Sequence, residues 1–152
     1  MRLSRWLPAS GVLLLCLCAT AAAQSSAQCP TLPAGTRLQW HVVDGPDFVF
    51  CRAVDSSTGQ QRFAVSIGRD AQFKPRRNNR IGNEVSIDGN AVYWYEGDVA
   101  FSPDMLIRET LLELDSGAHA HIIVRASDET QLGDTLQDVQ GLRFSGTQLG
   151  AK

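Results

Sequence analysis

The chain has 152 residues, a formal net charge of −2 at neutral pH and a hydrophobic content of 43%. This length suits one compact domain that buries a full-sized core. The slightly acidic charge balance argues against nucleic-acid binding, which needs a basic face, so nucleic acid is not expected as a partner.

The first 23 residues have the pattern of an export signal. A positive start is followed by a short apolar run at residues 11–17 and by Ala21-Ala22-Ala23, whose small side chains suit a signal peptidase. The apolar run is shorter than the roughly 20 residues of a membrane-spanning helix, so no stable membrane insertion is expected. We expect cleavage near Ala23 and a periplasmic protein whose formal charge falls to −4, because two arginines leave with the signal.

Two cysteines remain after the predicted signal, Cys29 and Cys51. An even number of cysteines in an oxidising compartment indicates a disulfide. Their separation and the absence of a CxxC pattern argue against the alternative, a metal-binding or reactive pair of thiols. We therefore expect a Cys29–Cys51 disulfide that ties an N-terminal leader segment, residues 24–36, to an early strand.

A single domain is predicted at residues 37–145, followed by a tail at residues 146–152. Runs of β-branched and aromatic residues between turn residues predict strands at 37–43, 48–54, 62–67, 85–87 and 91–95. The last two runs flank Asp88-Gly89-Asn90, which is typical of a hairpin. The aromatic side chains assigned to core packing are Trp40, Phe48, Phe50 and Phe63.

Residues 103–115 fit two structures. Ser102-Pro103-Asp104 is a good helix start, and apolar residues follow at helical spacing. As a strand, the segment instead turns at Asp115-Ser116-Gly117 and pairs with the next run, with Gly117 in the left-handed conformation. The paired residues are then Leu114 with Ala118, Leu112 with Ala120, Thr110 with Ile122, Glu113 with His119 and Leu111 with His121. The hairpin separates apolar from polar side chains and is favoured.

A capped helix is expected to end the domain. Ser127 or Asp128 suits the N-cap, Gly141 suits the end, and residues 142–144 fit a short final strand. One face of the helix carries Leu132, Leu136 and Val139. The fold class is therefore α+β: a mostly antiparallel twisted sheet of about six or seven strands, with the C-terminal helix packed on one face.

Two histidines in "AHAHIIV" form one candidate site. On a strand His119 and His121 share a face, with Glu113 opposite the first and Glu109 diagonal to the second. Two imidazoles and a carboxylate match the ligands of zinc, which makes a metal site the sharper hypothesis. Cross-strand Glu–His pairs are also common on surface strands, and no HExxH signature is present, so no cofactor is expected.

The loop "KPRRNNR" is the second candidate. It carries Lys74, Arg76, Arg77 and Arg80 in an otherwise acidic chain. Guanidinium groups grip carboxylates or phosphates through paired hydrogen bonds, and such a loop also suits an acidic cleft on a partner. A solvated surface loop without a specific role is the alternative.

Tyr93 and Tyr95 form the third candidate, because in a strand they share the face opposite Val92 and Trp94. Exposed tyrosines suit a partner contact, since they add area at low entropic cost. Burial in the core, or under a loop, is the alternative. We assign these two residues to partner binding together with the basic loop.

No GxSxG elbow, SxxK motif, phosphate-binding loop or dinucleotide fingerprint occurs, so we expect no enzymatic activity. The segment "RETLLELDSGAHAHIIVRASDETQLGDTLQDVQGLRF" resembles small exported bacterial proteins of PsbP-like α+β fold, in which a hairpin precedes a capped helix and an "LRF"-type strand. The resemblance implies a protein partner in the cell envelope, since this group includes proteins similar to immunity proteins that inhibit toxins or hydrolases. It assigns a role to no individual residue, and a factor for envelope assembly remains the alternative.

Overall fold

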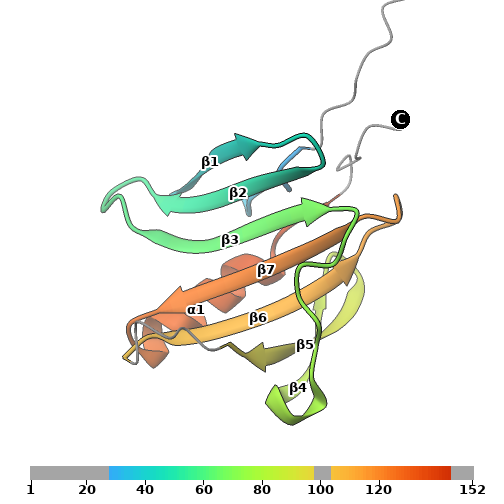
Figure 1. Cartoon of the computed structure of the whole chain (residues 1–152). Coiled ribbons are helices and arrows are strands. Elements are labelled where there is room, and N and C mark those ends of the chain that lie inside the picture. Colours follow the sequence, from blue (N-terminus) through green and yellow to red (C-terminus); the bar gives the residue numbers. More distant parts are fainter. Residues whose placement is uncertain (1–27, 98–103, 145–152) are drawn as a thin grey trace, which may run out of the picture.

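The structure is a computed structural model, and it describes residues 28–97 and 104–144. Seven strands form one antiparallel sheet (Figure 1), in the order β1-β2-β3-β7-β6-β5-β4. The strands are β1 (Leu38–Asp44), β2 (Phe48–Asp55), β3 (Gln61–Gly68), β4 (Arg80–Ile87), β5 (Asn90–Glu96), β6 (Leu106–Glu113) and β7 (His119–Ala126). The helices are the short 3-10 helix η1 (Arg77–Asn79) and α1 (Glu129–Gln140). The predicted α+β class is confirmed, whereas the predicted signal and C-terminal tail lie outside the described residues.

The helix α1 packs on one face of the sheet, where it contacts β7 and β4. Its buried side chains are Leu132, Thr135 and Val139. The Asp128 carboxylate caps its N-terminus by accepting a 2.8 Å hydrogen bond from the Gln131 N–H, and this bond lowers the pKa of Asp128. Gly141 caps the C-terminus, as predicted.

Residues 142–144 were predicted as a strand, and this prediction is wrong. Only Arg143 pairs, in an isolated bridge with Thr31. The Leu142 N–H turns back to the Val139 carbonyl, and the Phe144 N–H donates to the Asp88 carboxylate at 2.7 Å. These neighbouring amides are therefore already used, and no longer ladder forms.

The hairpin between β6 and β7 is confirmed in the predicted register. Leu112 lies opposite Ala120, Thr110 opposite Ile122, Glu113 opposite His119 and Leu111 opposite His121. The Leu114 N–H donates to the Ala118 carbonyl at 2.8 Å, and Gly117 has the left-handed φ of 75° that closes the turn. Residues 106–113 are therefore strand and not helix.

The hydrophobic core lies between the sheet and α1. Its fully buried large side chains include Phe63, Ile67, Ile87, Leu112, Ile122 and Leu142. The predicted disulfide between Cys29 and Cys51 is present and fastens the N-terminal segment over this layer. The Trp40 indole supports the same segment by donating a 2.7 Å hydrogen bond to the Pro30 carbonyl.

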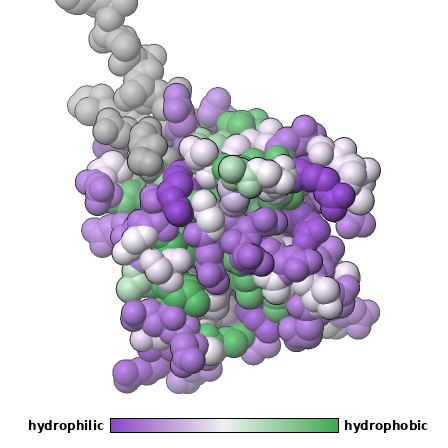
Figure 2. All heavy atoms as spheres, turned by 180° about the vertical axis from the view of Figure 1, so that it is seen from behind, coloured by the Kyte–Doolittle hydropathy of each residue, from purple (hydrophilic) through white to green (hydrophobic). Residues whose placement is uncertain are grey.

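On the helix side, hydrophilic side chains predominate at the surface and apolar ones form small separate areas (Figure 2). No helix among residues 28–97 and 104–144 is long and apolar enough to cross a membrane. The more distinctive surface is the opposite face of the sheet, which α1 leaves open.

Candidate partner-binding site

The open face of the sheet is crossed by the segment that joins β3 to β4, here called the crossing loop (residues 69–79). Strands β7, β6 and β5 lie between β3 and β4, so the chain must travel about 19 Å, given about 4.8 Å between neighbouring strands. Because α1 occupies the other face, the loop takes the open one. Figure 1 shows it passing in front of these strands.

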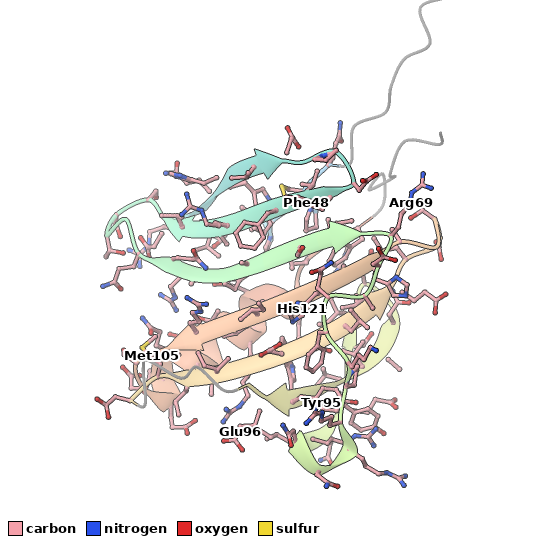
Figure 3. The ribbon with its side chains drawn as sticks, in the orientation of Figure 1. Phe48, Arg69, Tyr95, Glu96, Met105 and His121 are labelled. Carbon is pink, nitrogen blue, oxygen red and sulfur yellow. A yellow bond between two sulfur atoms is a disulfide. The ribbon has the colours of Figure 1, made fainter. Side chains whose placement is uncertain are left out.

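Phe73 fixes the middle of the crossing loop to the sheet. Its ring stacks on the imidazole of His121, with 5.1 Å between centroids and 7° between planes. It also meets the ring of Tyr95 edge-on at 5.6 Å. His121 on β7 and Tyr95 on β5 are 8% and 7% exposed, and both lie under the loop in Figure 3. The loop is therefore held by an aromatic contact to two different strands.

The two histidines of "AHAHIIV" both serve this loop. His121 Nε2 lies 2.8 Å from Glu109 Oε2, and since a carboxylate only accepts, the imidazole donates from Nε2. This hydrogen bond orients the His121 ring on which Phe73 stacks. His119 Nδ1 lies 3.0 Å from the carbonyl oxygen of Arg69, so it holds the first residue of the loop. The two histidines one residue apart are therefore explained by their contacts with the crossing loop.

The metal hypothesis required His119, His121 and a glutamate to converge. The structure brings His121 to Glu109, but it turns the His119 ring towards the Arg69 carbonyl. Glu113 is an exposed ladder partner of His119. Among the described residues, no three His, Cys, Asp or Glu side chains group closely enough to hold a metal ion. The predicted ligand set is therefore not assembled.

The basic side chains of residues 74–80 divide into two kinds. The guanidinium of Arg80 lies 3.7 Å from the centroid of the Tyr93 ring, a cation–π contact that fixes the end of the loop. Lys74, Arg76 and Arg77 are exposed, and within the described part of the chain their side chains make no hydrogen bond or ion pair. These three cations remain available to a partner.

The expectation that Tyr95 offers a contact surface is wrong. Tyr95 is 7% exposed because Phe73 covers it, and Tyr93 is half-buried under Arg80. Val92 and Trp94 lie in the core, on the opposite side of β5 as predicted. The two tyrosines therefore support the crossing loop and the start of β4.

The prediction that Phe48 packs in the core is wrong, because its side chain is 42% exposed. It lies on the open side of β2, where its ring covers Gly45 so closely that a side chain at that position would collide with it. A groove of about 470 Å³ adjoins it at the start of the crossing loop. Figure 3 labels two of its lining residues, Phe48 and Arg69. The groove is lined by Asp47, Phe48, Ser66, Gly68, Arg69, Asp70 and Gln72.

Comparisons of the chain with models of known protein families, with curated proteins and with solved structures find no match. A fixed loop that directs a lysine and two arginines to solvent is suited to binding carboxylates, because guanidinium groups make paired, charge-assisted hydrogen bonds to them.

Replacing Phe73 by alanine should release the crossing loop. We expect the free energy of unfolding to fall by about 1–2 kcal/mol, since two aromatic contacts are lost. Trypsin should then cut after Arg76 or Arg77 at least about ten times faster, because cleavage follows local opening. Phe73→Trp keeps the stacking and is the matched control. Equal cleavage rates for Phe73→Ala and the wild type would show that Phe73 does not hold the loop.

Proposed function

We propose that this protein is a non-enzymatic, periplasmic protein-binding module that inhibits a toxin or peptidoglycan hydrolase acting in the cell envelope, as immunity proteins do. One observation carries the proposal: the crossing loop is attached at His119, at His121 and through Arg80, yet its three central cations have no partner among the described residues. A loop fixed before binding loses little conformational entropy when it binds, so its charges contribute more fully to affinity.

The charge of the loop favours an acidic target. Most glycoside hydrolases cleave sugar polymers with a pair of Asp or Glu side chains that flank the scissile bond. A cleft of this kind presents carboxylates with which the exposed side chains of Arg76 and Arg77 would form charge-assisted hydrogen bonds. Insertion of the loop would neutralise the catalytic carboxylates and exclude the substrate.

The remaining features agree with this proposal. The export pattern at residues 1–23 and the disulfide both suit an oxidising compartment. The resemblance of residues 108–144 to small exported proteins of PsbP-like fold implies the same kind of role. A factor for envelope assembly shares these features, but it gives no reason for a preformed basic loop.

Parallel affinity capture from the cell envelope tests the proposal. The baits are the disulfide-bonded wild type, Arg76→Glu/Arg77→Glu, and Arg52→Glu/Arg125→Glu, which makes the same charge change at exposed arginines of β2 and β7. We expect a hydrolase or toxin to be retained by the first and third baits, and to lose activity when wild-type protein is added. Retention by all three baits, or retention of proteins without such activity, would refute the proposal.

A further inference from the structure

The two edges of the sheet are built differently. The edge strand β4 is irregular: its register with β5 shifts between Ile81 and Val85, where Gly82 has a φ of 66°. It also carries the charged residues Arg80 and Glu84. Bulges and charges of this kind prevent a further strand from pairing. The edge strand β1 has no such protection, because it pairs with β2 one-to-one over its whole length and contains a single charged residue, Asp44.

The register of β1 against β2 determines which backbone N–H and C=O groups of β1 point away from the sheet. Outside the strand ends, the Gly45 N–H donates to the Phe48 carbonyl and the Ser56 N–H to the Arg37 carbonyl. Hydrogen-bonded pairs alternate with non-bonded ones in an antiparallel ladder, so the odd-numbered residues of β1 bond to β2. The even-numbered residues direct their backbone N–H and C=O groups away from the sheet. These residues are Leu38, Trp40, Val42 and Asp44.

The apolar exposure of the molecule is concentrated at the same edge. Among the described residues the exposed large hydrophobic side chains are Val42, Val43 and Phe48, and the two valines are each 50% exposed. Val42 projects to the face covered by α1 and Val43 to the open face. An added strand would cover both valines at once, whereas a ligand on either face would cover one.

We propose that β1 pairs antiparallel with β1 of a second copy of this chain, and that the two sheets join into one. The charged residues at the two ends of β1 favour a second copy of this chain as the pairing partner. Arg37 precedes the strand, whereas Asp44 ends it. Antiparallel self-pairing therefore places Arg37 of one copy next to Asp44 of the other at both ends of the interface, whereas parallel pairing would bring like charges together.

The two-fold axis passes through His41. In this register all four even-numbered residues of β1 lie in hydrogen-bonded pairs. Trp40 lies opposite Val42 of the second copy, and Leu38 lies opposite its Asp44. The N–H of Leu38 already donates to Thr36 Oγ1 at 3.3 Å, so the central bonds of Trp40 and Val42 carry the pairing. His41 faces His41 of the second copy in a non-hydrogen-bonded pair, where Cα atoms lie about 4.5 Å apart. The interface does not rest on the function proposed for the crossing loop.

A cysteine placed on the axis tests this register. His41→Cys should form a disulfide-linked dimer under mild oxidation, because the distance across a non-hydrogen-bonded pair falls within the range that a disulfide spans. Gln39→Cys, two residues along the same face of β1, is the matched control. It lies opposite Val43 of the second copy, so the two introduced cysteines are too far apart to link and no disulfide-linked dimer should form. Equal cross-linking of the two variants, or none in His41→Cys, would overturn the proposal.

Sedimentation of the unmodified protein gives an independent readout. The wild type should shift from monomer to dimer between about 10 and 500 μM, as expected for a small interface. Val42→Pro removes an outward N–H without touching the bonds to β2, and should stay monomeric throughout, whereas Val42→Thr keeps the N–H and should still dimerise. If Val42→Pro does not fold, Val42→Lys serves in its place. A wild type that is monomeric at the highest concentration would also overturn the proposal.

Discussion

Reversing the charges of Arg76 and Arg77 is expected to weaken binding of the proposed envelope partner by at least about 100-fold, because close charge pairs at interfaces couple by about 1.5 kcal/mol or more. The double variant turns two attractions into repulsions. Its melting temperature should stay within about 2 °C of the wild type, since neither side chain has an ion pair or hydrogen bond among the described residues. Isothermal titration against the captured partner measures the loss of affinity.

Two further variants make this measurement specific. Arg52→Glu/Arg125→Glu carries the same change in net charge and should bind like the wild type. Arg76→Lys/Arg77→Lys keeps the charge but removes the planar fork, so an intermediate loss is expected if the partner offers carboxylates. Wild-type affinity in Arg76→Glu/Arg77→Glu would remove the crossing loop from the proposed function.

Replacing Cys29 and Cys51 together by alanine should lower the free energy of unfolding by about 3 kcal/mol. The disulfide closes a loop over a sequence separation of 22, and cross-linking a loop of that size restricts the unfolded chain by about this amount. The remaining core still spans the sheet and α1, so the variant should fold. Urea denaturation of the variant, beside the wild type with and without reductant, measures the difference.

The reduced wild type should match the double alanine variant, because both lack the same link. Trp40 fluorescence offers a local readout, since its indole donates to Pro30 in the segment that the disulfide holds. A difference of less than about 1 kcal/mol between the oxidised wild type and the variant would mean that the N-terminal segment stays ordered through Trp40 and Thr31 without the disulfide.

The local structure was predictable because short-range chemistry determines it. Asp88 and Gly89, both with positive φ, form the turn expected between the fourth and fifth strands, and Asp128 forms the expected helix cap. The β6–β7 register followed from the alternation of polar and apolar side chains. Each of these features depends on residues close together in the sequence, where spacing alone restricts the geometry.

The site was only partly predictable because it depends on strand order. Nothing in the spacing of residues 62–95 shows that β6 and β7 insert between β3 and β5, and this insertion is what draws the crossing loop over His121. Phe73 is the single aromatic residue of a polar loop. Such a residue indicates that the loop packs against the domain, but it does not show which strands the loop contacts. The burial of Tyr95 and the role of His121 both follow from where Phe73 lies.

Hydrogen–deuterium exchange of the complex tests the central claim most directly, because it reports which segment meets the partner. The amides of residues 69–80 should exchange more slowly in the complex than in the free protein, while those of α1 keep their rates. The same protection should be absent when the partner is mixed with Arg76→Glu/Arg77→Glu. Protection confined to α1 or to another part of the sheet, with the crossing loop unchanged, would contradict the account.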